Sequence, residues 1–478
     1  MTTSSGPSPE DCPPDAPSPK PRFDLPSIPG STIPRKIAWL AGPVFVEQSL
    51  LYLIGLSDTV LTGRHLSSDD LAGVTVAGYL LWFLASVLTI ASIGGTALVA
   101  RSVGAGRWEA ANRACGQAFL LGLGLGLALA VGVDRFAGGL VERMNLAGTA
   151  AWSAERYLQL VGIVLPLLAC TAVGNACLRG AGDTRTGMKV MALMNLINIT
   201  ASWTLALGLG PFPRLGLTGV ALGTAVGEGV GGMLILTALI RGRSGLRLTW
   251  PHLRPDREVL RRLLRVSLPA TGESLTNVVC QLWFLGLINR LGAVATAAHG
   301  VAIRCEAIAF LTISAFAVAA STLTGQCLGA HRPELAIRSA RAAWLLGTAV
   351  LSILGILLYA GAEVMFRFFL AGRQPEVLEA GVPVLRLVCL ALPALATINV
   401  LNGTLNGAGD TRWPWLITMT GYLAVRLPLT EWFIALPHDG GWGLGLWGAW
   451  LAMFADLYLR AVLVAGRFLS GRWVRVRV

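Results

Sequence analysis

Long apolar stretches, separated by short polar or basic connections, run along most of the chain. The stretches that are nearly free of charge lie at 79–100, 118–133, 190–209, 342–360 and 444–464. About 20 apolar residues in a helix span the hydrocarbon core of a bilayer, so runs of this length predict membrane-spanning helices. Division of the chain at its Gly, Pro and Arg breaks predicts twelve helices, at 33–63, 71–100, 110–133, 154–178, 186–208, 217–240, 264–291, 293–323, 341–360, 382–405, 413–436 and 444–466.

The second half of the chain repeats the first. The phrase LRGAGDTR at 178–185 returns as LNGAGDTR at 405–412. Other matches keep nearly the same separation: Pro43 and Glu47 with Pro269 and Glu273, 103–108 with 328–333, and 216–225 with 445–454. The unit is too long for a solenoid and is typical of a membrane protein with two pseudo-equivalent halves. The sequence therefore predicts an all-α integral membrane protein of twelve transmembrane helices in two pseudo-symmetric six-helix lobes.

Composition and charge agree with this architecture and orient it. Hydrophobic residues make up 54% of the chain and charged residues only 13%, about half the charged share of a soluble domain. An even number of spans puts both termini on one side, and the connections on that side hold about twice as many Arg and Lys as the others. Because basic loops stay in the cytoplasm, we expect both termini there and the protein in the cell (inner) membrane.

The net charge of +12 then needs no nucleic-acid partner, and residues 241–265, which are rich in Arg, are expected to contact anionic membrane lipids. The expected segments are a disordered cytoplasmic tail at 1–32, one lobe at 33–240, a cytoplasmic linker at 241–263, a second lobe at 264–466 and a basic cytoplasmic tail at 467–478. The eight cysteines are scattered singly and carry no metal-site spacing. We expect them to pack as small side chains, and the sequence indicates no cofactor.

Several phrases resemble those of transporters in the multidrug and toxic compound extrusion (MATE) family, whose superfamily includes lipid and polysaccharide flippases. The resemblance covers almost all of residues 33–473, and its order and spacing make it specific. Its carriers are LSDTVLTGRHLSSDDLAGV at 56–74, the two GAGDTR phrases, MNLINIT at 194–200, AAHGVAIRCEAIAF at 297–310 and LTGQCLGA at 323–330. The resemblance implies two six-helix lobes around a central cavity that faces alternate sides, and export of cationic or amphipathic compounds driven by H⁺ or Na⁺.

An acid inside a membrane span is costly and is a functional candidate. Asp58, near the outer end of the first span, has two interpretations: a polar residue at a wet helix end, or the coupling-ion carboxylate that the resemblance implies. Asn198 and Ser202 share a face of the fifth span; they either pack helices together or join the ion site. Some relatives have a second carboxylate where this chain has Ser202. The expected ion-binding set is Asp58, Asn175, Asn198, Ser202 and Thr224, with H⁺ and Na⁺ both open and Na⁺ held at Asp58 and Asn198.

The repeat makes Glu47 and Glu273 equivalent, each one turn after the proline of its helix. Either both form structural hydrogen bonds, or they belong to a substrate or second proton site. The expected members of that site are Glu47, Glu273, Asn277 and Glu306. Asn277 stands where some branches of the family carry their seventh-helix acid, so Glu273 is not equated with that acid.

Two further motifs are expected to be structural. GAGDTR predicts a turn, in which glycine takes the left-handed conformation and Asp183 or Thr184 begins the next helix. Asp456 and Arg460 are spaced for an ion pair within one helix, which Arg426 is expected to share.

Two other classes of protein are weighed against an antiporter. A membrane enzyme would need clustered acids or a His–Glu set, which the sequence lacks, so we expect no enzyme. A flippase for a lipid-linked precursor has the same fold and remains the alternative; its cue is a strongly cationic central cavity. The expected partners are a small cationic or amphipathic molecule, H⁺ or Na⁺, and lipids, and we expect a monomer.

Overall fold

The computed structural model describes residues 32–144, 146, 148–370, 374–435 and 440–476, and the regular structure in these residues is helical. The predicted tail at 1–32 lies almost wholly outside them. The helices of the first lobe are α1 Ile33–His65, α2 Ser68–Gly104, α3 Trp108–Arg143, α4 Gly148–Gly162, α5 Leu165–Gly180, α6 Arg185–Leu207 and α7 Leu217–Ile240. The short helices η1 Arg243–Gly245 and η2 Trp250–Leu253 follow.

The second lobe has the same plan. Its helices are α8 Arg257–Asn289, α9 Ala293–Gly329, α10 Pro333–Ala360, α11 Ala362–Leu370, α12 Pro375–Ala408, α13 Arg412–Met419, the π-helix η3 Thr420–Arg426, α14 Leu427–Ile434 and α15 Gly445–Leu469. The helix η5 Arg472–Arg475 ends the described chain.

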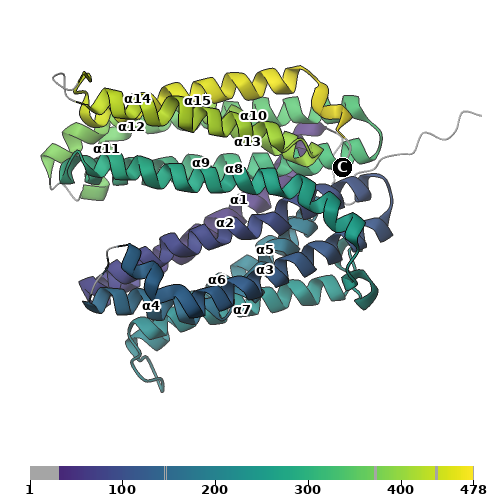
Figure 1. Ribbon diagram of the computed structural model, residues 1–478, viewed down its shortest axis with the longest axis horizontal. Coiled ribbons are helices and arrows are strands. Elements are labelled where there is room, and N and C mark those ends of the chain that lie inside the picture. Colours follow the sequence, from purple (N-terminus) through teal and green to yellow (C-terminus); the bar gives the residue numbers. More distant parts are fainter. Residues whose placement is uncertain (1–31, 145, 147, 371–373, 436–439, 477–478) are drawn as a thin grey trace, which may run out of the picture.

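The two lobes form a V (Figure 1), with the first lobe in purple to teal and the second in green to yellow. They meet at the end of the bundle that carries the C-terminus and diverge toward the other end. We call the first end the basic end, because the arginines of 241–262 lie there, and the other the opposite end. Buried apolar residues fill the interior of each lobe.

The twelve predicted helices are present. Nine described helices are long and apolar enough to cross a membrane, and α4 with α5, bent by 58°, makes a tenth span. The break comes just before Pro166, which removes a backbone donor. The seventh predicted span is α8, and the eleventh is formed by α13, η3 and α14 in succession. The prediction of two six-helix lobes is confirmed.

Some helix bounds differ from the prediction. Helix α8 begins at Arg257, within the predicted linker, because Asp256 Oδ1 accepts the backbone N–H groups of Glu258 and Val259 at 3.0 and 3.2 Å. Helix α10 begins at Pro333, before the predicted start at 341. The first turns of these helices carry charged residues, so apolar runs alone place their starts too late.

Beyond α15, Trp473 is fully buried against Phe468.

The lobes are held together at the basic end by close packing of α2 on α9. A Cβ atom at Gly104 would lie 2.0 Å from the carbonyl oxygen of Gln326, and one at Gly329 would lie 2.0 Å from that of Arg101. The repeat that matches 103–108 with 328–333 makes Gly104 equivalent to Gly329 and Arg101 equivalent to Gln326, so the contact is pseudo-symmetric. Gln326 Nε2 also donates to the carbonyl oxygen of Gly180 at 2.9 Å. We call this contact the glycine seal.

The GAGDTR phrases form turns, as predicted. Gly182 and Gly409 have φ values of +94° and +84°, which favour glycine. Asp183 Oδ1 accepts the backbone N–H groups of Arg185 and Thr186 at 3.1 and 3.0 Å. Burial alone would raise the pKa of the Asp183 carboxyl, but hydrogen bonds from Ser244 and Thr186 and the nearby Arg243 hold that pKa below its ordinary value.

The cysteines behave as small packing residues in the part of the chain that the structure describes. Seven are buried there with free thiols, and Cys12 lies outside the described residues.

Candidate functional site

Asp58 lies in a polar cluster at the meeting point of four helices in the first lobe. Its side chain on α1 is buried, with 3% of its surface exposed. Asp58 Oδ2 accepts a hydrogen bond from the Tyr157 hydroxyl of α4 at 3.0 Å and from the Thr224 hydroxyl of α7 at 2.9 Å. Asn198 Nδ2 of α6 donates to Thr224 Oγ1 at 3.2 Å. The structure thus brings Asp58, Asn198 and Thr224 together.

Tight packing of α6 on α7 fixes this cluster. A Cβ atom at Gly223 would lie 2.2 Å from Ser202 Oγ, and one at Gly227 would lie 2.8 Å from Asn198 Cβ. The Ser202 hydroxyl donates to the carbonyl oxygen of Val220 at 3.3 Å. Ser202 therefore lies beside the cluster, but its hydrogen bond joins it to α7 and not to Asp58.

Several buried acceptor atoms in this lobe have no donor. Within the described part of the chain, Asp58 Oδ1 and Asn198 Oδ1 are both buried without a hydrogen-bond partner. Among the described residues, no cationic side chain forms an ion pair with Asp58. Unpartnered polar groups in an apolar interior are costly. A proton on Asp58 would satisfy its Oδ1, and a cation that binds oxygen ligands would satisfy either atom.

Asn175 belongs to a second cluster, nearer the basic end. Its Nδ2 donates to Glu47 Oε1 at 3.3 Å, and Arg179 Nη1 forms an ion pair with the same oxygen at 3.1 Å. Glu47 lies three turns before Asp58 on α1, which is about 16 Å along a helix. The structure therefore places Asn175 with Glu47, away from Asp58.

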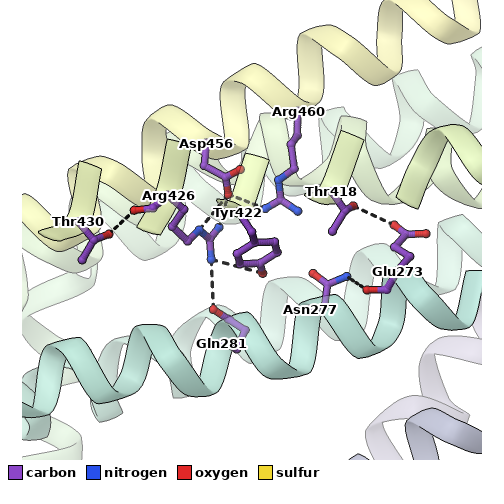
Figure 2. A network of polar contacts seen from close by, with 9 residues as sticks. All are labelled: Glu273, Asn277, Gln281, Thr418, Tyr422, Arg426, Thr430, Asp456 and Arg460. Carbon is purple, nitrogen blue, oxygen red and sulfur yellow. Dashed lines mark hydrogen bonds and ion pairs between the residues drawn. The ribbon is translucent and has the colours of Figure 1, made fainter. Parts of the chain in front are cut away.

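The repeat places a related but unequal cluster in the second lobe. Glu273 Oε1 accepts from Asn402 Nδ2 at 2.7 Å, just as Glu47 accepts from Asn175. Thr418 also donates to it, at 3.3 Å (Figure 2). At the place of Arg179 the second copy has Asn406. Glu47 therefore has a cationic partner, whereas among the described residues Glu273 has no ion pair.

Glu273 faces a cavity of about 460 Å³ between the second lobe and α2. Asn277 and Glu306 line the same cavity, as do Trp82 and Tyr422. A smaller cavity of about 310 Å³ shares Glu273 and Asn277 and extends toward Arg179. Three of the four residues predicted for the substrate site thus line one cavity, and Glu47 lies apart with Arg179.

Three charged side chains at the edge of this cavity form a triad. Asp456 Oδ2 of α15 accepts from Arg426 Nε at 2.9 Å and from Arg460 Nη2 at 2.8 Å (Figure 2). The expected Asp456–Arg460 pair and its sharing by Arg426 are confirmed. All three side chains are almost fully buried, and Gly421 makes room for them, since a Cβ atom there would lie 2.1 Å from Asp456 Oδ1.

The sequence interpretation missed two residues near Asp58. Tyr157 donates to Asp58, and Glu228 stands one turn after Thr224 on α7, close enough to Tyr157 to interact with it electrostatically. For Glu228 the sequence does carry a signal, because a lone acid inside an apolar span is itself a functional candidate. Tyr157 gives no such signal, since tyrosine is common near membrane interfaces.

The structure has the features of a membrane transporter. It has two pseudo-symmetric lobes, a buried carboxylate cluster in the first lobe and a charged cavity against the second. The family MatE matches residues 43–204 and 269–432. The probable multidrug resistance protein NorM of Thermotoga maritima is 31% identical over 92% of this chain and 93% of its own length. The uncharacterized transporter YisQ of Bacillus subtilis is 24% identical over 91% of this chain and 94% of its own length.

A solved structure described as the outward-facing conformation of a multidrug resistance MATE family transporter has the same fold. Its TM-score is 0.83 at 21% identity, over 92% of this chain and 96% of that one. The chain belongs to the MatE family of multidrug efflux transporters, as its sequence motifs indicate.

Proposed function

We propose that the protein is an antiporter that exports organic cations and amphipathic compounds, and that inward movement of H⁺ or Na⁺ drives the export. The observation that carries this proposal is the buried cluster at Asp58. Among the described residues this carboxylate has no ion-pair partner and it lies beside unpartnered oxygens, which supports a reversible site for a small cation.

In this proposal the two lobes have different tasks. Asp58, Asn198 and Thr224 bind the coupling ion, with Tyr157 as a further member, while Glu273, Asn277 and Glu306 face the substrate in the cavity. Glu47 is paired with Arg179 and stabilises the first lobe. Ser202 and Asn175 support neighbouring helices rather than the ion.

Coupling requires that ion and substrate favour different conformations. An ion at Asp58 would draw together ligands on α1, α6 and α7 and so favour one packing of the first lobe. Helix α2 follows α1 directly and lines the cavity with Trp82. A change in α1 can therefore reach the substrate site through α2, and alternating access needs the glycine seal to open. The basic end is the cytoplasmic one in this proposal.

The chemistry of the cluster suits both ions. The carboxylate, amide and hydroxyl oxygens of Asp58, Asn198 and Thr224 are hard ligands of the kind that Na⁺ prefers. A proton on Asp58 would satisfy Oδ1 equally well. A flippase for a lipid diphosphate is not proposed, because Glu273 and Glu306 line the cavity together with Arg426 and Arg460, and the cavity is therefore not strongly cationic.

The test is efflux of a fluorescent organic cation from proteoliposomes under an inward H⁺ gradient, an inward Na⁺ gradient, or neither. We expect one gradient to accelerate efflux by the wild type and neither to accelerate efflux by Asp58→Asn. The matched control is Asp134→Asn, which changes an exposed aspartate of α3 in the same lobe. Gradient-driven efflux by Asp58→Asn at the wild-type rate would exclude Asp58 as the coupling residue.

A further inference from the structure

A cavity of about 670 Å³ lies at the basic end, where the two lobes meet. It shares no lining residue with the cavity that Glu273 faces. The glycine seal forms part of its wall, since Arg101 and Gly329 both line it. The remaining wall comes from the turn between α2 and α3, the first turns of α3 and α8, and η5. Residues of both lobes therefore enclose this space, which we call the interlobe cavity.

The interlobe cavity gathers positive charge from both lobes. Five arginines line it: Arg101, Arg107 and Arg113 from the first lobe, and Arg262 and Arg475 from the second. Among the described residues, two acids line it as well, Asp256 and Glu258. With His331 counted as neutral, three positive charges remain. Like charges that converge between two lobes repel one another, so they raise the free energy of the closed basic end.

Three of these arginines have donors to spare. In the described part of the chain, the Arg107 and Arg475 side chains form no hydrogen bond or ion pair. Arg101 uses Nη2 alone, which donates to the carbonyl oxygen of Val476 at 2.8 Å. The other two arginines are paired with glutamates of their own helices. The donors of Arg101, Arg107 and Arg475 therefore remain for a ligand.

A phosphate group is the ligand that suits this arrangement. It carries up to two negative charges and offers oxygens in tetrahedral directions, so arginines from α2, the α2–α3 turn and η5 can each donate to it. A single carboxylate or a chloride ion offers fewer acceptors and only one charge. The volume of the cavity also leaves room for part of a larger phosphate ester.

We propose that the interlobe cavity binds a phosphate group and that the bound phosphate holds the basic end closed. Arg101 and Arg107 belong to the first lobe and Arg475 to the second, so opening of the glycine seal takes the site apart. A ligand that binds only the closed state favours that state. Two sources present this group: a soluble phosphate compound and the headgroup of an anionic phospholipid. The inference goes beyond the proposed antiport and does not depend on the coupling ion or the substrate.

The test measures the separation of the lobes at the basic end. Lys189 on α6 and Arg338 on α10 are exposed, belong to different lobes and do not line the interlobe cavity. Lys189→Cys and Arg338→Cys, in a background that replaces the eight native cysteines, take spin labels. Double electron–electron resonance between the labels gives the closed fraction in phosphatidylcholine nanodiscs, without substrate or ion gradient. Inorganic phosphate is titrated, and sodium chloride of equal ionic strength is the control.

A second arm distinguishes the two sources of phosphate. Nanodiscs that contain phosphatidic acid present a phosphate monoester from the membrane, and no soluble phosphate is added. Closure by inorganic phosphate supports a soluble ligand, and closure only with phosphatidic acid supports a lipid headgroup. In the arm with the matching source, we expect the ratio of closed to open molecules to rise about tenfold, an ordinary size for coupling between a ligand and a conformational change.

Arg107→Gln and Arg475→Gln locate the site, with one change on each lobe. We expect each to raise the phosphate concentration needed for half of the closure about tenfold, the effect of one lost charge-assisted hydrogen bond. Without phosphate, both variants should be more closed than the wild type, because each removes a repelling charge. Loss of a merely structural contact would have the reverse effect. The matched control is Arg472→Gln, an exposed arginine of η5 that does not line the cavity, and it should respond as the wild type does.

Two results would overturn the proposal. One is that neither inorganic phosphate nor phosphatidic acid raises the closed fraction more than sodium chloride does. The other is that Arg107→Gln and Arg475→Gln respond like Arg472→Gln. If one of the two variants does not fold, the other and the wild type still decide. Because no gradient is used, either result leaves the coupling test at Asp58 unaffected.

Discussion

The glycine seal offers a direct test of how the basic end opens. In Gly104→Ala the added Cβ atom would lie 2.0 Å from the carbonyl oxygen of Gln326, whereas real Cβ atoms essentially never approach within 3.0 Å. Because the obstacle is backbone, α2 and α9 must separate by about 1 Å. Overpacking of this kind destabilises the closed basic end by about 1–3 kcal/mol. The fraction of molecules in which the basic end is open therefore rises by a factor of about five to about a hundred.

The assay is the rate at which an impermeant maleimide, added at the basic end, labels a cysteine at position 321. Ser321 lines the smaller cavity beneath the seal. The background for Ser321→Cys replaces all eight native cysteines. We expect labelling to accelerate in Gly104→Ala and in Gly329→Ala. The double variant should gain less than the product of the two effects, because one separation relieves both contacts.

The controls are Gly78→Ala on α2 and Gly300→Ala on α9, where a Cβ atom would meet nothing within 4 Å. Both should label at the wild-type rate. If Gly104→Ala labels no faster than Gly78→Ala, the seal does not govern access to the cavity.

Three further predictions concern other acids. Glu228→Gln should slow ion-driven efflux about tenfold and leave the binding of a fluorescent organic cation unchanged; unchanged efflux in vesicles would remove Glu228 from the coupling site. Glu47→Gln leaves Arg179 without its ion-pair partner and should lower the thermal stability. Glu273→Gln should keep the wild-type stability but weaken the binding of cationic ligands by about 1–3 kcal/mol. Binding of neutral ligands should not change, and titrations with both ligand types would check this. Asp183→Asn should be less stable than the wild type at neutral pH. Since folding lowers the pKa of Asp183, the wild type's advantage is complete above its ordinary pKa of 3.8 and is lost as the pH falls through the lowered pKa; a difference in melting temperature that does not vary with pH would contradict this.

Most of the fold follows from local sequence. Apolar runs set the helices, and the repeat sets the two lobes, because both are read along the chain without knowledge of packing. The predicted starts of α8 and α10 fall too late because charged first turns extend past the apolar runs. The π-helix η3, which presents Tyr422 and Arg426 to the cavity, lies within the predicted span 413–436, but nothing in the sequence distinguishes its π geometry from an ordinary α-helix.

The sites follow from the sequence only in part. The resemblance to a family groups Asp58, Asn198 and Thr224, and the structure brings them together. The sequence analysis also groups Asn175 with these residues, but in the structure Asn175 donates to Glu47. The rotation of α5 about its axis decides which helix this amide faces, and the sequence does not give that rotation. The difference between Glu47 and Glu273 depends on a single change in the repeat, Arg179 against Asn406, whose meaning appears only when the side chains are placed in space.

The central claim is that Asp58 couples ion entry to export of organic compounds. The most direct measurement loads proteoliposomes with a fluorescent organic cation as the dye, on the side that the basic end faces, and records H⁺ and Na⁺ movement in the opposite direction with fluorescent indicators. We predict that the dye gradient drives movement of one of these ions in the wild type, and that Asp58→Asn binds the dye but moves neither ion. Dye transport by the wild type without ion movement, or ion movement by Asp58→Asn at the wild-type rate, would contradict the account.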